Sequence, residues 1–374
     1  MTALSIIMSS LLLIAVVFTW TLTTATAAWV PAAGGMPSNL NKITYRYGTR
    51  PNKLLPDTRL MSQLSNEYNT NTALIPKSDI NLDDEIRTCY LQRIGFSVDE
   101  ANELISSSPD LENLERLLSA HLVTVPFENM DQHEHPSHEE TPLIPRRNKL
   151  PSLDVTRSLE KIIFHNRGGF CFELNFSFRS LLSSLGYTTR LALADVACDQ
   201  PVPGHVVILV DGLMDVPVLV DVGFGDPGVC DVLLPVKHNS PKDDSHGDLF
   251  EFHIDDLTDR FDTRLCRTRV SNSAKDGSGC DEEKMYRFKL DDDMEMSAAE
   301  FYEGLDRVLT TSPTFTGKRI CVLSNSGGHV TLGKDYIKWV EKGESVRRIE
   351  LPNETLWRAA LKDRFGITLN PENN

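Results

Sequence analysis

The sequence predicts a mixed α/β fold, because helical and strand patterns occupy different parts of the chain. Apolar residues recur at helical spacing between residues 82 and 122 and again between 174 and 185. From residue 190 to 236 the pattern changes to short apolar runs that are typical of buried strands. Residues 296–369 alternate the two patterns. A chain of 374 residues with both patterns is expected to form about two or three domains.

Start and stop signals support the helices between residues 82 and 122. The acidic run Asp83–Glu85 would lie in a first turn, and Gly95 would end that helix. Ser97 has the character of an N-cap, and Pro109 is expected to begin the next helix.

The strands follow in a block. Apolar runs near Leu191, Val206 and Val218 predict the first strands, and the run 319–323 predicts another in the C-terminal part. Two acidic stretches rich in Gly, Ser and Lys are predicted to be surface loops. They are 237–248 and 271–283.

The N-terminal residues differ from the rest of the chain. Residues 1–28 are apolar and end in Ala25-Thr-Ala-Ala, which indicates a signal peptide or a membrane anchor, although no Lys or Arg precedes the apolar stretch. Residues 29–78 are mildly basic and rich in Ser, Thr and Asn, as expected of a disordered linker or a transit-like segment. These patterns leave open a cleaved signal, a retained anchor and import into an organelle.

Charge and cysteine content narrow the partners and the compartment. The net charge is −15, which argues against nucleic acid as a partner and limits membrane contact to residues 4–28, if these are retained. The seven cysteines form no CxxC pair, so the part of the chain that holds them suits a reducing compartment better than a disulfide framework.

Cys171 stands at the most informative point of the sequence. It follows Gly168-Gly169 and precedes an apolar series at helical spacing that Gly186 ends. The pattern places Cys171 in the first turn of a helix, where the helix dipole favours a thiolate. A cysteine taken alone is more often a small buried apolar residue, so its function depends on its neighbours in the fold.

A predicted hairpin supplies these neighbours. His205 opens one apolar run, and a second run, 216–222, carries Asp221. If the chain reverses at Leu213, His205 lies directly opposite Asp221, with the two Cβ atoms about 4.5–5.5 Å apart. Cys171, His205 and Asp221 together form an activated nucleophile, in which the base takes the thiol proton and the acid orients the base.

The segments around these three residues resemble those of the arylamine N-acetyltransferase family. The similar segments are Ala120–Leu122, Val125–Asn129, Leu153-Asp154, Arg167–Asn175, Pro203–Val206 and Asp221–Gly225, with weaker similarity as far as Leu369. The resemblance implies a helical bundle at 79–186 that carries the nucleophile, a β-barrel at 187–290 that carries His and Asp, and an α/β lid at 291–374. It also implies a Cys-His-Asp core like that of the cysteine proteases.

The resemblance also implies a reaction and its binding residues. Acetyl-CoA would be the co-substrate, with no permanently bound cofactor, and the acetyl group would pass through a Cys171 thioester to an arylamine, hydrazine or hydroxylamine. Phe127 would line the acceptor pocket, Gly225 would lie near its wall, and Ser312 and Thr314 would bind substrate or cofactor. Members of the family commonly have Ser in place of Thr314, which leaves that contact open.

Several alternatives remain open from the sequence. The same triad could serve an amide synthase or a thiol hydrolase, and the same fold could serve a silent binding protein. The stretch His133–Glu140 is rich in His and Glu, but Pro136 interrupts any regular ligand face, so a solvated loop is expected and no metal site. Asn175-Phe-Ser and Asn353-Glu-Thr are sequons for N-glycosylation. The sequence does not indicate an oligomeric state.

Overall fold

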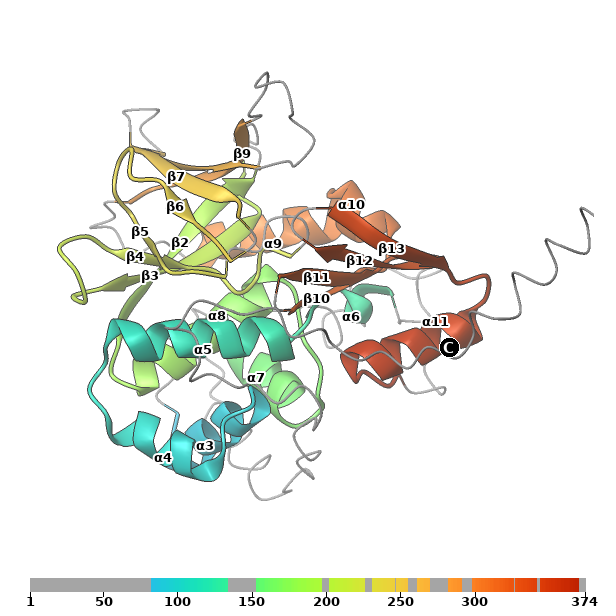
Figure 1. Ribbon diagram of the computed structural model, residues 1–374, viewed down its shortest axis with the longest axis horizontal. Helices are drawn as coiled ribbons and strands as arrows, with labels where there is room; N and C mark the ends of the chain where they lie inside the picture. The colour runs from blue at the N-terminus through green and yellow to red at the C-terminus, as the bar shows by residue number, and fades with distance from the viewer. Residues whose placement is uncertain are drawn as a thin grey trace, which may run out of the picture. The chain divides into compact units, whose positions relative to one another are not determined.

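The computed structural model describes the chain from residue 82 to residue 369, with gaps (Figure 1). The described ranges are 82–133, 153–196, 202–225, 231–245, 247–254, 261–269, 282–290, 298–325, 327–341 and 344–369. The predictions for residues 1–78 and for 134–140 lie outside these ranges. Within the described ranges, none of the helices has the length and apolar character needed to cross a membrane.

The N-terminal half of the chain is mainly helical and includes α8 (Cys171–Ser184), which is buried along nearly its whole length. The others are α3 (Asp84–Arg93), α4 (Val98–Ser106), α5 (Leu111–Thr124), α6 (Met130–His133) and α7 (Val155–Ile163). Apolar side chains such as Phe172, Phe178 and Leu181 are fully buried, and each contributes roughly 1.5–3 kcal/mol to folding. Helix α8 is therefore the centre of the main hydrophobic core.

Local signals set the ends of these helices much as the sequence predicts. Asp83 and Ser97 accept hydrogen bonds from first-turn N–H groups of α3 and α4. Asp110, one residue beyond the predicted Pro109, caps α5 in the same way. Gly186 follows α8 with a φ of 90°, in the left-handed region that glycine favours.

The predicted barrel is an eight-stranded antiparallel sheet with the strand order β5-β4-β3-β2-β9-β8-β7-β6. The strands are β2 (Thr188–Val196), β3 (His205–Asp211), β4 (Val218–Val220), β5 (Leu234–Pro235), β6 (Lys242–Asp243), β7 (Leu249–Ile254), β8 (Thr263–Thr268) and β9 (Glu282–Phe288). Lys242 Nζ on β6 donates to the Leu233 carbonyl beside β5 at 2.7 Å, which brings the two edges together into a nearly closed barrel. The predicted loop 237–248 thus contains the short strand β6.

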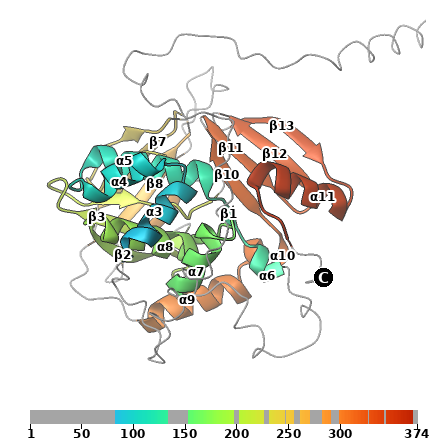
Figure 2. The same ribbon diagram turned by 90° about the horizontal axis from the view of Figure 1, so that it is seen from below.

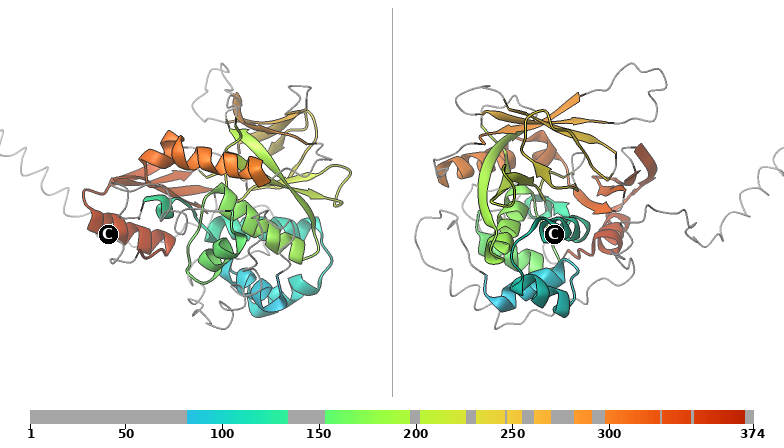
Figure 3. Two further views of the ribbon diagram at one scale, coloured as in Figure 1. Left: turned by 180° about the vertical axis from the view of Figure 1, so that it is seen from behind. Right: turned by 60° about the vertical axis from the view of Figure 1, so that its left-hand side comes forward.

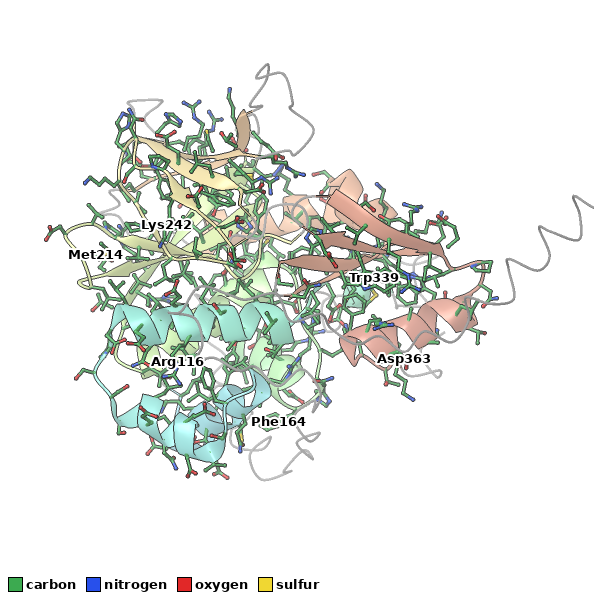
Figure 4. The ribbon with its side chains drawn as sticks, viewed as in Figure 1. Arg116, Phe164, Met214, Lys242, Trp339 and Asp363 are labelled. Atoms are coloured by element: carbon green, nitrogen blue, oxygen red, sulfur yellow. The ribbon has the colours of Figure 1, made fainter. Side chains whose placement is uncertain are left out.

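The β3–β4 hairpin differs from its predicted register. Ile208 lies opposite Val220, so the hairpin is symmetric about Met214, one residue beyond the predicted point. Figure 4 labels Met214 in the loop that joins the two strands. Moving the centre of the hairpin by one residue moves the position opposite His205 by two residues, so the predicted direct opposition of His205 and Asp221 is wrong. Asp221 comes just after β4. Because side chains alternate between faces with a period of two, this shift keeps the two residues on one face.

A second antiparallel sheet has the order β1-β10-β11-β12-β13. Its strands are β1 (Phe127–Glu128), β10 (Cys321–Asn325), β11 (Gly328–Leu332), β12 (Tyr336–Glu341) and β13 (Glu344–Glu350). Strand β1 comes from the helical segment, where a two-residue strand gives no periodic signal. Helix α11 (Glu354–Ala360) and the π-helical turn η3 (Leu361–Phe365) pack beside this sheet, with Trp357 in their shared core (Figure 2).

Helix α9 (Ala298–Thr310) lies next to α8, and the short α10 (Pro313–Gly317) follows it (Figure 3). The rings of Phe301 on α9 and Phe176 on α8 meet edge to face at 5.5 Å. A Cβ at Gly304 would lie 2.5 Å from the Pro203 carbonyl oxygen, so only glycine permits this approach. Helix α9 thereby supports the segment that leads into His205.

Candidate active site

Cys171 is the first residue of α8 and is 3% exposed. Its Sγ lies 3.7 Å from the Gly204 carbonyl oxygen, next to His205 in the chain. A Cβ added at Gly223 would lie 2.7 Å from the Cys171 Cα, so the chain after Asp221 passes directly against the helix start. The start of α8 is thus held between the segments that carry His205 and Asp221.

His205 and Asp221 meet despite the shifted register. His205 Nε2 donates to Asp221 Oδ2 at 2.7 Å, and both side chains are buried. The Cys171 side chain also interacts with His205 and contributes to the rise of the His205 pKa. Since Nε2 is taken by the carboxylate, Nδ1 is the ring nitrogen left to face the thiol. The structure therefore brings together the three residues that the sequence selects.

The charges of this group reinforce one another. Burial disfavours a cationic His205, but the Asp221 carboxylate and the Cys171 side chain outweigh it and raise the pKa of His205 to about 10. Burial likewise opposes ionisation of Asp221, but His205, Asn175 and the Gly223 N–H hold its pKa below the usual value. His205 is therefore cationic at neutral pH.

Asn175 is a site residue to which the sequence alone assigned no role. Its Nδ2 donates to the Val206 carbonyl at 2.7 Å and to Asp221 Oδ1 at 2.9 Å, while its Oδ1 accepts from the Val222 N–H at 3.0 Å. Asn175 lies four residues after Cys171 on α8, hence on the same helix face, which is the signal that could have identified it. It is fully buried, so its sequon has no room for a glycan in the folded protein.

Two aromatic rings pack on the His205 imidazole. The ring centroids of Phe224 and Tyr286 lie 5.2 and 5.3 Å from that of His205, and the two rings also contact each other. They hold the imidazole in place and exclude water from it. Tyr286 comes from β9, and no sequence motif links it to His205.

A narrow cavity lies beside the Asp221 segment. Its lining residues are Leu122, Val125, Phe127, Asp221, Val222, Phe224, Gly225, Val322 and Ser324. Gly225 has a φ of 76°, and a Cβ there would lie 3.0 Å from the Phe127 ring. The solvent-accessible volume is about 10 Å³, enough for about one water molecule. A larger molecule can enter only if the lining side chains move.

The structure does not place the other two predicted binding residues in this cavity lining. Ser312 is the N-cap residue of α10. Thr314 belongs to α10, and its side chain is outside the described part of the structure.

A buried network of five charged residues lies beneath the start of α8. Arg167 donates hydrogen bonds to Glu128 from two nitrogens, at 2.8 and 3.1 Å, and donates one to Asp131 at 2.7 Å. Lys161 Nζ donates to Asp131 at 2.8 Å and to both oxygens of Glu173 at 2.9 and 3.0 Å. The network joins β1, α6, α7 and α8. Its partners are too far apart in sequence for any local pattern to predict.

The network holds three carboxylates and two cations, so one negative charge is in excess. Burial opposes charge at Glu128 and Asp131, but Arg167 and Lys161 outweigh it and keep both pKa values below the usual range. At Glu173, burial together with the charges of Asp131 and Glu128 raises the pKa, and Lys161 offsets this only in part. Glu173 is thus the least compensated acid of the network.

The raised pKa of His205 predicts how stability depends on pH. The folded-state pKa of about 10 exceeds the unfolded value of about 6.5, so the stabilisation is complete below the lower value and is lost as the pH rises towards the higher one. Urea unfolding is measured for the wild type and His205→Gln at several pH values between these limits. The difference between their free energies of unfolding should become smaller as the pH rises. A difference independent of pH would contradict a charged His205.

Comparisons with known proteins agree on one family. The family model described as N-acetyltransferase matches residues 110–374. An arylamine N-acetyltransferase / N-hydroxyarylamine O-acetyltransferase from Salmonella typhimurium is 36% identical over 121 residues, which cover 31% of this chain and 38% of that protein. An arylamine N-acetyltransferase from Escherichia coli is 26% identical over 74% of this chain and 87% of its own length.

A solved structure of the Mycobacterium marinum arylamine N-acetyltransferase in complex with CoA has the same fold. Its TM-score is 0.58 and its sequence is 23% identical, over 75% of this chain and 92% of that one. The helices, the nearly closed barrel and the second sheet therefore have the arrangement that the resemblance implied. Since the family model also spans most of the sequence, the chain belongs to the arylamine N-acetyltransferase family.

Proposed function

We propose that the protein transfers an acetyl group from acetyl-CoA to an arylamine, hydrazine or hydroxylamine through a thioester on Cys171. The observation that carries the proposal is the buried hydrogen bond between Asp221 and His205, beside Cys171 at the start of α8. Membership of the family and the names of the relatives support the choice of donor and acceptor.

In the first half-reaction the Cys171 thiolate attacks the thioester carbonyl of acetyl-CoA. The oxygen of the tetrahedral intermediate gains negative charge, and the Cys171 main-chain N–H, which has no intrahelical acceptor, is the proposed donor to it. When the intermediate collapses, the C–S bond to CoA breaks and His205 Nδ1 gives its proton to the departing sulfur. This step leaves acetyl-Cys171, free CoA and a neutral His205.

In the second half-reaction the amine nitrogen attacks acetyl-Cys171. His205 Nδ1 accepts the proton that the nitrogen loses, and the bond between carbon and Sγ breaks to release the acetylated amine. The cationic His205 and the Cys171 thiolate are thereby restored. Asp221 keeps Nε2 protonated throughout, so that Nδ1 is the nitrogen that exchanges protons.

The binding assignments extend this proposal. We assign Phe127 and Gly225 to the acceptor pocket, because both line the cavity beside Asp221. Ser312 and Thr314 remain proposed contacts to substrate or cofactor. The narrow cavity means that acceptor binding requires the Phe127 and Phe224 side chains to move.

The experiment that tests the function measures CoA release against acceptor concentration. Release should rise with added arylamine and should be absent in Cys171→Ala. Release that is insensitive to the acceptor would favour a thiol hydrolase instead. No release with the wild type, under conditions in which it is folded, would contradict the proposal.

A further inference from the structure

We propose that Lys161 and Glu173 are positioning residues for Cys171, and that they fix the first turn of α8 and with it the thiol and its main-chain N–H. The inference rests on the proposed function of Cys171 as nucleophile. It assigns a task to two buried charged residues that do not reach the reacting atoms themselves.

Glu173 holds the start of the helix from within its first turn. Its Oε2 accepts the N–H of Phe170, the residue just before the helix, at 3.3 Å. A Cβ at Gly169 would lie 2.7 Å from both Cβ and Oε2 of Glu173, so the incoming chain rests directly on this side chain. The position of the Cys171 backbone therefore depends on where the Glu173 carboxylate stands.

Lys161 fixes that carboxylate. Its Nζ donates to both Glu173 oxygens, at 2.9 and 3.0 Å, and its third hydrogen bond goes to Asp131 at 2.8 Å. All three ammonium donors are thus used, and the three side chains come from α6, α7 and α8. Because Lys161 is 8% exposed, water cannot replace these bonds without a rearrangement of the core.

The charge of Lys161 matters as well as its bonds. The network of Glu128, Asp131, Glu173, Lys161 and Arg167 has a formal charge of −1 when all five are ionised, since three acids face two bases. Without Lys161 the excess becomes two negative charges, and the less compensated Glu173 lies two residues from Cys171. A negative charge so close in a buried setting opposes formation of the thiolate.

Four variants separate positioning from a purely structural contribution. Glu173→Gln keeps an oxygen that can accept the Phe170 N–H, whereas Glu173→Ala removes it. Lys161→Met removes the cation and leaves the carboxylate. The double variant Lys161→Met/Glu173→Gln returns the charge excess to that of the wild type while keeping the acceptor.

The readout is the rate constant for alkylation of Cys171 by iodoacetamide at neutral pH, followed by peptide mass spectrometry so that the other cysteines do not contribute. Cys171→Ala gives the background, and circular dichroism gives the folded fraction to which each rate is normalised. We expect Glu173→Gln to stay within about threefold of wild type. Glu173→Ala and Lys161→Met should be slower by about tenfold, and the double variant should recover most of the rate lost by Lys161→Met.

If Lys161 and Glu173 only stabilise the fold, the alkylation rates follow a different pattern. The variants would unfold more easily, but the Cys171 in their folded fraction would react as in the wild type, and the double variant would be no better than Lys161→Met. Either result overturns the inference. Alkylation does not require acetyl-CoA, so CoA release measured on the same samples shows separately whether the proposed function itself fails.

Discussion

Replacing Asp221 by Asn is expected to lower the rate of acetyl transfer by about 100-fold or more. Asp221 Oδ1 accepts from Asn175 Nδ2 and from the Gly223 N–H, so the oxygen of an introduced amide must occupy that position. The amide nitrogen then faces His205 Nε2 and forces it to become an acceptor. The proton moves to Nδ1, and a neutral His205 in this tautomer cannot accept the Cys171 proton.

Two further measurements on Asp221→Asn complete this test. Circular dichroism should show an unchanged fold, because the substitution preserves the shape and the hydrogen bonds to Asn175 and Gly223. Alkylation of Cys171 at neutral pH should slow together with acetyl transfer. If Cys171 in the variant reacts as fast as in the wild type, Asp221 has only a structural part.

Replacing Arg167 by Met is expected to cost about 3–5 kcal/mol of unfolding free energy. The substitution leaves the fully buried Glu128 with Lys161, at 3.9 Å, as the remaining cation of its ion pairs, and removes one of two cations from Asp131. A buried carboxylate without its partner is costly, whereas the long apolar side chain of Met fills most of the space. Urea unfolding followed by circular dichroism gives the difference.

The matched control is Arg348→Met, which removes the exposed ion pair with Glu350 at 2.7 Å. Exposed pairs of this kind are screened by water and contribute little to the free energy of unfolding. A loss for Arg167→Met no larger than that of the control would show that the buried network does not stabilise the fold.

The sequence was sufficient to select Cys171, His205 and Asp221, which the structure brings together, because two of its signals are local. The double glycine and the apolar spacing define the start of α8 at Cys171, and the paired apolar runs define the hairpin. The register of that hairpin was wrong because the sequence does not give the length of the turn around Met214. His205 and Asp221 still form their hydrogen bond, because a shift of two residues keeps them on the same face.

The features that the sequence could not give depend on contacts between distant residues. Lys161 is hydrogen-bonded to Asp131, 30 residues away in the sequence, and to Glu173, 12 residues away. No local sequence pattern links these positions. Tyr286 reaches His205 because β9 and β3 pair with the two sides of β2. Likewise, β1 joins the second sheet through Val322, far along the chain.

The proposed thioester on Cys171 is tested most directly by the intact mass of the protein after mixing with acetyl-CoA in the absence of an acceptor. The account predicts one added acetyl group, located on the peptide that contains Cys171 and lost again when an arylamine is added. Cys171→Ala should take up none, although the other six cysteines remain. Equal acetylation of the wild type and Cys171→Ala, or an acetyl group that the amine does not remove, would contradict the account.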